Sequence, residues 1–281
     1  MVAVSSKNNK VASDNSSELA AGQLVIIGGA EDKEGECSIL REFVRRAGGR
    51  NARIVVMTVA TGLPEEVGTE YRRIFEGLGT DIVDIIDTAT KEDARESRYL
   101  DLIEEATGVF FTGGDQARIT ELLRDTETHS LLQRRYQEGL IIGGTSAGAA
   151  MMPETTIIEG DSETNPTIDS VVLSEGMGFF PDVAIDQHFS QRGRIGRFVS
   201  AIMQSSTSLG FGIDENTAII VNGDRIEVIG EGAVTIVDTA NISHSNIDEA
   251  LHDDALAICG AKLHILPHGY SFSLKDRDCL C

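Results

Sequence analysis

The segment from Leu140 to Ala150 reads Leu-Ile-Ile-Gly-Gly-Thr-Ser-Ala-Gly-Ala-Ala. A short apolar run enters a glycine turn, and the small residues and methionines beyond it favour a helix. Ser146 stands at this turn, where small neighbours permit a strained elbow with an exposed hydroxyl. Taken alone, the segment fits a helix cap at Thr145 or Ser146 equally well.

The same alternation of apolar runs and amphipathic stretches recurs along the chain. Runs at 24–27, 54–57, 82–86, 109–111 and 140–142 predict buried strands, and ranges 39–47, 65–78 and 119–123 predict helices. This order predicts an α/β fold with a mostly parallel sheet flanked by helices on both faces. Closely spaced strand-like runs at 218–221, 226–229, 234–237 and 263–266 predict a β-rich C-terminal edge on the same domain.

Composition and charge exclude several classes of function. The chain has 281 residues and a formal net charge of -21, a field that repels nucleic acid. The acidic excess fits a solvated surface, with attraction of a cationic substrate as the alternative. No apolar run is long enough to span a bilayer, so we expect no membrane partner.

The ends of the chain and its cysteines complete this outline. Residues 1–21 are rich in Ser, Asn and Lys, which predicts a disordered lead-in, and 22–281 should form a single α/β domain. The four cysteines are too few for a disulfide framework and are expected to be reduced thiols. Together with the absence of a leader-like N-terminus, they predict a cytoplasmic protein.

A second glycine-rich loop, Phe-Thr-Gly-Gly-Asp-Gln at 111–116, also follows an apolar run. Paired glycines let the backbone approach a ligand closely, so Gly114 or Asp115 could join the N–H of Ala147 in an oxyanion hole. The alternative is a tight turn with Asp115 as a helix N-cap. Two such loops at neighbouring strand ends favour the functional interpretation.

A base for the serine is suggested by the segment Ile-Asp-Gln-His-Phe at 185–189. His188 is the one histidine just past an apolar strand among polar neighbours, and imidazole is the usual acceptor of a serine proton. The arginines that follow, Arg192, Arg194 and Arg197, suit a substrate that carries carboxylates. Spacing alone does not choose the carboxylate that orients the base, for which the candidates are Glu159, Asp161, Glu163, Asp186 and Glu215.

These motifs, with Gly-Ile-Asp-Glu-Asn-Thr-Ala at 212–218, resemble the cyanophycinases from about residue 23 to about residue 269. That family is grouped with aspartyl dipeptidases among serine peptidases of a class I glutamine-amidotransferase-like fold. The resemblance implies hydrolysis of cyanophycin, a polypeptide rich in Asp and Arg, to β-Asp-Arg dipeptides by an exopeptidase. It further implies a homodimer that uses no metal and no cofactor.

The resemblance also implies roles for individual residues. Ser146 is the expected nucleophile and His188 the general base. The expected substrate pocket consists of Gln116, Asp186, Gln187, Arg192, Arg194 and Arg197.

The third catalytic residue is where this chain departs from the family pattern. The family places its glutamate two residues before a proline in Gly-Ser-Gly-Glu-x-Pro, whereas Thr164 stands at that position here and Glu163 precedes it. We expect Glu163 to serve. Two alternatives stay open: an aspartyl or isoaspartyl dipeptidase of the same clan, and an inactive binding homologue.

Overall fold

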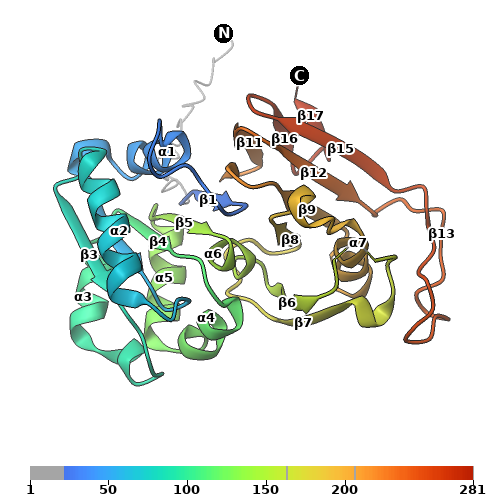
Figure 1. Ribbon diagram of the computed structural model, residues 1–281, viewed down its shortest axis with the longest axis horizontal. Coiled ribbons are helices and arrows are strands. Elements are labelled where there is room, and N and C mark those ends of the chain that lie inside the picture. Colours follow the sequence, from blue (N-terminus) through green and yellow to red (C-terminus); the bar gives the residue numbers. More distant parts are fainter. Residues whose placement is uncertain (1–21, 163, 206, 281) are drawn as a thin grey trace, which may run out of the picture.

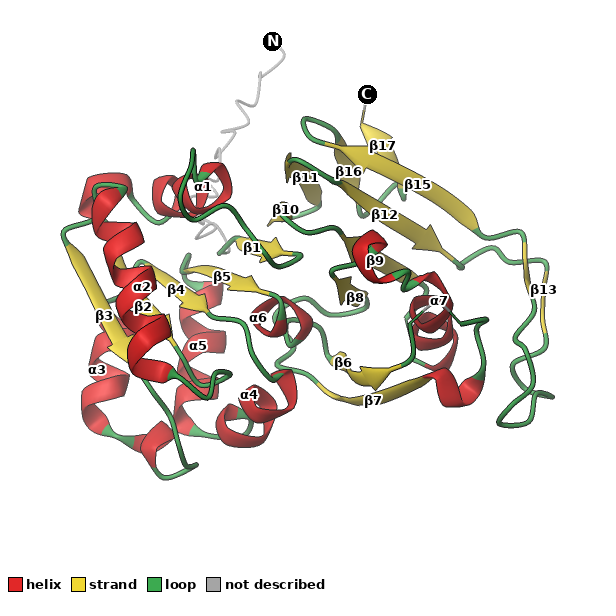
Figure 2. Cartoon of the chain, viewed as in Figure 1, coloured by secondary structure: helices red, strands yellow, loops and turns green. Residues whose placement is uncertain are grey.

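The computed structural model describes residues 22–162, 164–205 and 207–280. The predicted lead-in at 1–21 lies outside them. The helices and strands alternate over the first half of the chain, and strands dominate the second half (Figure 2). The helices are α1 (Ser38–Arg46), α2 (Pro64–Gly77), α3 (Ser97–Glu105), α4 (Gln116–Leu123), α5 (Glu127–Gln137), α6 (Ala147–Ala150) and α7 (Ile195–Gln204).

The strands form one large sheet, one smaller sheet and two hairpin-like pairs. They are β1 (Leu24–Ile27), β2 (Arg53–Met57), β3 (Ile82–Ile86), β4 (Gly108–Phe111), β5 (Ile141–Thr145), β6 (Thr155–Gly160), β7 (Val171–Glu175), β8 (Ala184–Gln187), β9 (Leu209–Ile213), β10 (Thr217–Asn222), β11 (Arg225–Gly230), β12 (Ala233–Asp238), β13 (His244–Ser245), β14 (Ile258–Cys259), β15 (Lys262–Pro267), β16 (Ser271–Ser273) and β17 (Asp278–Leu280).

The large sheet has the strand order β17-β16-β11-β10-β1-β5-β4-β2-β3. The half that runs from β1 to β3 is parallel, as the alternation of strand and helix predicts. Helices α1 and α2 bury their apolar stripes on one face, and α3, α4 and α5 bury theirs on the other (Figure 1). The predicted α/β fold with helices on both faces is confirmed.

The C-terminal half of the same sheet is antiparallel. Strand β10 pairs with β1, and β11, β16 and β17 continue outward from it. The predicted β-rich C-terminal part is confirmed, with the runs at 218–221 and 226–229 in this edge as β10 and β11 and those at 234–237 and 263–266 in a separate sheet as β12 and β15. Because β10 runs opposite to β1, its first residues lie beside the carboxyl end of β1, where Ile27 pairs with Ala218.

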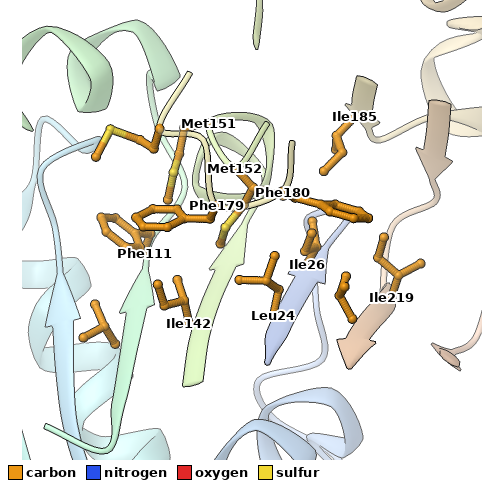
Figure 3. Close-up of a cluster of buried hydrophobic side chains, with 14 of the residues drawn as sticks. Leu24, Ile26, Phe111, Ile142, Met151, Met152, Phe179, Phe180, Ile185 and Ile219 are labelled. Atoms are coloured by element: carbon orange, nitrogen blue, oxygen red, sulfur yellow. The ribbon is translucent and has the colours of Figure 1, made fainter. Parts of the chain in front are cut away.

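A second sheet, in the order β15-β12-β9-β8, was not predicted from the sequence. Strands β8 and β9 are its parallel pair, with Gln187 opposite Ile213. The two sheets share one hydrophobic core, to which Ile26 and Ile142 of the large sheet and Ile185 of β8 all belong (Figure 3). That residues 22–281 form a single domain stays a prediction.

The carboxyl ends of β1, β4, β5, β8 and β9 determine where a site can form. The parallel pairings of β1 with β5, β5 with β4, and β8 with β9 bring neighbouring ends together. Loops that follow neighbouring parallel strands therefore meet at the same edge of the sheet. Within the described residues, none of the helices has the length and apolar character needed to cross a membrane.

Candidate active site

Ser146 occupies a strained turn between β5 and α6. Its backbone has φ 52° and ψ -107°, a left-handed φ that a residue with a side chain adopts only when its surroundings hold it there. The N–H of Ser146 donates to the carbonyl oxygen of Ile27 at 3.1 Å, which ties the turn to β1. The elbow predicted from the sequence is therefore present, and the Ser146 side chain does not cap α6.

His188 lies beside this serine. It follows β8 directly, also has a positive φ of 48°, and is only 9% exposed. Its Nε2 atom is 2.9 Å from Ser146 Oγ, and its Nδ1 atom is 2.6 Å from Oε1 of Glu215. With Nδ1–H donating to the carboxylate, Nε2 is left to accept the serine proton.

The pKa of His188 lies below its ordinary value of 6.5, mainly because burial disfavours the charged ring. The nearby positive charge of Arg192 lowers this pKa further, whereas the hydrogen bond to Glu215 raises it. The imidazole is consequently neutral near pH 7, which is the form that can take a proton from Ser146.

Glu215 was one of five carboxylates that the sequence left open, and the register of β8 and β9 explains its place. Gln187 pairs with Ile213 in parallel strands, so the residues just beyond each strand emerge side by side. His188 is the first residue after β8, and Glu215 is the second after β9. Glu163, the carboxylate expected from the family pattern, lies outside the described residues.

The end of β1 and the loop after it connect the segments that carry these side chains. Three consecutive carbonyl oxygens each accept a backbone N–H: Ile27 from Ser146 (3.1 Å), Gly28 from His188 (2.8 Å) and Gly29 from Asn216 (2.9 Å). Glycine is required at two of these positions. A Cβ on Gly28 would lie 2.1 Å from the carbonyl oxygen of Asp214, and one on Gly29 would lie 2.3 Å from the ring of His188.

The second glycine loop faces the serine as expected. A Cβ on Gly113 would lie 3.5 Å from Ser146 Cβ, and Gly114 takes a φ of +145° against the backbone of Ala60. The N–H of Asp115, however, donates to the carbonyl oxygen of Ala60 at 2.9 Å, and its side chain caps α4 through Ala117. Asp115 therefore has the structural role that the sequence left as the alternative, and its N–H is turned away from an oxyanion.

The other two predicted oxyanion-hole residues, Gly114 and Ala147, belong to the two glycine loops. Ala147 is the first residue of α6, so its N–H begins the helix directly after the serine. Gly148 packs so closely on β4 that a Cβ would lie 2.4 Å from the carbonyl oxygen of Phe111. The two glycine loops are therefore held against each other at neighbouring strand ends.

Four of the predicted pocket residues form a buried network beneath His188. Asp186, which is 1% exposed, accepts from Nε of Arg197 at 2.8 Å and pairs with Nη1 of Arg194 at 3.3 Å. Arg194 also donates to the backbone and side-chain oxygens of Gln187. Burial lowers the pKa of Arg194 to about 10, so the guanidinium is still charged near pH 7.

Gln116 and Arg192 differ from those four. Gln116 begins α4, and its amide nitrogen donates to the carbonyl oxygens of Ile157 and Ile158 at 2.8 and 3.1 Å, which ties the loop to β6. Arg192 is exposed, and its charge acts on the nearby imidazole. Of the three predicted arginines, it is therefore the one whose guanidinium faces solvent.

Comparison with known proteins identifies the family of this chain. The model of peptidase family S51 matches residues 24–229. The cyanophycinase of Trichormus variabilis is 39% identical over 259 residues, which cover 92% of this chain and 87% of that protein. The cyanophycinase of Geminocystis herdmanii is 38% identical and covers 91% of this chain and 94% of its own length.

Solved structures show the same fold at lower identity. A peptidase from an acI-B1 Actinobacterium has a TM-score of 0.69 at 19% identity, covering 91% of this chain and 98% of that one. A putative peptidase E protein from Listeria monocytogenes has a TM-score of 0.53 at 16% identity, covering 75% and 99%. The chain belongs to peptidase family S51, together with its cyanophycinase relatives, and is a serine-type peptidase.

Proposed function

We propose that this chain is an exopeptidase that hydrolyses cyanophycin, a polyaspartate with arginine on each β-carboxyl, to β-Asp-Arg dipeptides. The observation that carries the proposal is the hydrogen-bonded series Ser146, His188 and Glu215. It occurs in a chain that is 39% identical to a protein named cyanophycinase over 92% of its length.

The geometry supports acyl transfer through serine. Ser146 Oγ attacks an aspartyl main-chain carbonyl while its proton passes to His188 Nε2, 2.9 Å away. The tetrahedral intermediate collapses, the C–N bond breaks, and the same proton goes to the leaving amine. Water then attacks the ester and gives a proton to His188, and Oγ regains that proton as the acid product leaves.

Glu215 holds the imidazole for both steps. Its carboxylate accepts from Nδ1–H at 2.6 Å, which selects the tautomer that Ser146 needs and stabilises the imidazolium when it forms. We assign the oxyanion hole to the N–H groups of Gly114 and of Ala147, the first residue of α6. Donors of this kind contribute about 10²–10³-fold each to kcat in serine peptidases.

Substrate recognition falls to Arg192 in this proposal. An arginine joined through its α-amine keeps a free carboxylate, and a guanidinium binds carboxylates with two parallel hydrogen bonds. Arg192 is exposed beside His188, whereas Arg194 and Arg197 are buried on Asp186. We therefore assign substrate contact to Arg192. The buried Arg194 and Arg197 instead support the strand that precedes His188.

The assembled site speaks against an inactive homologue, because a binding protein has no need of a serine in a strained elbow beside a neutral histidine. The alternative function, an aspartyl or isoaspartyl dipeptidase, is distinguished by the experiment below. That enzyme would release products from short aspartyl or isoaspartyl peptides and leave the polymer intact.

The decisive experiment incubates the purified protein with cyanophycin and detects β-Asp-Arg by mass spectrometry, with short aspartyl peptides in parallel. Ser146→Ala is the control, because it removes the attacking oxygen alone. We expect dipeptide from the wild type and none from the variant. Equal release from both would refute the nucleophile, and cleavage of short peptides only would refute the polymer as substrate.

The assembly and location of the protein belong to the same proposal. We infer a cytoplasmic homodimer. Support comes from edge strand β15, which exposes Leu263 by 60% and Ile265 by 61%, a feature common at interfaces. Light scattering coupled to gel filtration tests the dimer, and a monomer at micromolar concentration would refute it. Cell fractionation tests the location.

A further inference from the structure

A carboxylate with no role in the proposed chemistry lies behind the nucleophile. Glu31 stands in the loop after β1 and is 6% exposed. Its two oxygens each accept from a neutral hydroxyl, Oε1 from Tyr71 of α2 and Oε2 from Thr145 of β5. Burying a carboxylate is costly unless its hydrogen bonds are met, so these contacts require a functional or structural reason.

Thr145 is the residue directly before Ser146 and is 3% exposed. The strained φ of 52° at Ser146 persists only where the surroundings hold it. One restraint is the Ser146 N–H bonded to Ile27. The hydroxyl of Thr145 bonded to Glu31 is a second restraint, on the preceding side chain.

Helix capping is not the function of the Thr145 hydroxyl, which donates to Glu31. The N-terminus of α6 receives no side-chain cap, so neither Thr145 nor Ser146 is used for capping. Glu31 belongs to the loop after β1, in which Gly28 accepts the N–H of His188. Burial raises the pKa of Tyr71 well above its usual range, so its hydroxyl stays protonated and keeps donating to the carboxylate.

We propose that Glu31 is a positioning residue that, by holding the Thr145 hydroxyl, keeps the Ser146 turn in the geometry that places Oγ within reach of His188. The inference rests on the proposed role of Ser146 as the nucleophile. It concerns the hydrolytic step rather than substrate binding, because Glu31 is buried beneath the turn. Its loss should consequently lower kcat and leave KM nearly unchanged.

Variants of Thr145 test this most directly. Thr145→Val keeps the shape of the side chain and removes the hydroxyl, whereas Thr145→Ser keeps the hydroxyl. Misplacement of a reacting group by about 1 Å costs on the order of 100-fold, so we expect Thr145→Val and Glu31→Ala to lower kcat by about 10- to 100-fold. The rate at which a serine-directed phosphonate labels Ser146 should fall by the same factor, and Thr145→Ser should restore both.

Thr128→Val is the matched control for loss of a buried threonine hydroxyl. Thr128 is 1% exposed in α5, and its hydroxyl donates to the carbonyl oxygen of Ala94 at 2.6 Å, away from the serine turn. It should lower thermal stability without changing kcat or the labelling rate. If Glu31→Ala does not fold, as judged by circular dichroism, the three threonine variants still decide the question.

Each outcome has one meaning. Unchanged kcat and labelling in Thr145→Val would overturn the inference, as would an equal loss in Thr145→Ser or in Thr128→Val. These results leave the proposed function intact as long as Ser146→Ala is inactive. Full activity of Ser146→Ala would instead overturn the proposed function itself.

Discussion

Replacement of Glu215 by glutamine tests the site most sharply. The carboxylate lies 2.6 Å from Nδ1 of His188, and the amide has nearly the same shape, so the fold should be preserved. Glutamine can turn its NH₂ group toward Nδ1, which then becomes an acceptor and leaves the proton on Nε2. His188 would then present a donor to Ser146 where an acceptor is required.

The expected loss of kcat has two causes, a lost charged hydrogen bond and the wrong tautomer of His188. A hydrogen bond to a charged group contributes about 1.5–3 kcal/mol, and about 1.4 kcal/mol corresponds to a factor of ten. This alone gives roughly 10- to 100-fold. The wrong tautomer adds to it, and in the Ser-His-Asp template the equivalent change costs about 10⁴-fold in kcat. The Glu215 side chain is 36% exposed, so water can replace part of the lost hydrogen bonding. We therefore expect kcat of Glu215→Gln to fall by about 10²–10⁴-fold.

The assay is steady-state release of β-Asp-Arg across a pH series. Glu215 raises the pKa of His188, so its loss should lower that pKa and move the acidic limb of kcat/KM to lower pH. Glu159→Gln, a change at an exposed carboxylate of β6, should retain wild-type rates.

Two results would refute the reasoning. One is activity of Glu215→Gln within about threefold of the wild type, far below the loss expected from a charged hydrogen bond. The other is a hundredfold loss in Glu163→Gln with Glu215→Gln unaffected, because the orienting carboxylate would then be the one expected from the family pattern.

Three further outcomes follow from the structure. Removing the positive charge in Arg192→Gln should raise the pKa of His188, so the acidic limb of kcat/KM moves to higher pH and KM for the polymer increases; an unmoved limb would contradict the electrostatic link. Gly29→Ala places a Cβ 2.3 Å from the ring of His188 at a φ of +99°, and we expect kcat to fall by about 10- to 100-fold in a folded protein. Asp186→Asn leaves two buried guanidinium groups without their counter-ion, so we expect the free energy of unfolding, measured by urea titration, to fall by about 3–5 kcal/mol. A fall of less than about 1 kcal/mol would show that the network does not stabilise the fold.

Most of the fold could be predicted because its signals are local. The apolar runs at 24–27, 54–57 and 82–86 became β1, β2 and β3, and the range 65–78 became α2 within one residue at each end. Periodicity records which face of a segment is buried, and that is a property of neighbouring residues. The second sheet was missed because its strand order joins segments far apart in the chain.

The site divides in the same way. Residue type and local setting were enough to select Ser146 and His188, since a serine in a glycine turn and a histidine after a strand are visible in the sequence. The partner of His188 was not visible, because Glu215 meets it only through the parallel register of β8 and β9. The hydrogen bond from the Asp115 N–H to Ala60 and the burial of Arg194 on Asp186 likewise depend on contacts between segments distant in the chain. The sequence by itself therefore determined the α/β architecture and the chemical groups available. Only the tertiary structure decided which of those groups meet, because strand order and register bring together residues that no local pattern relates.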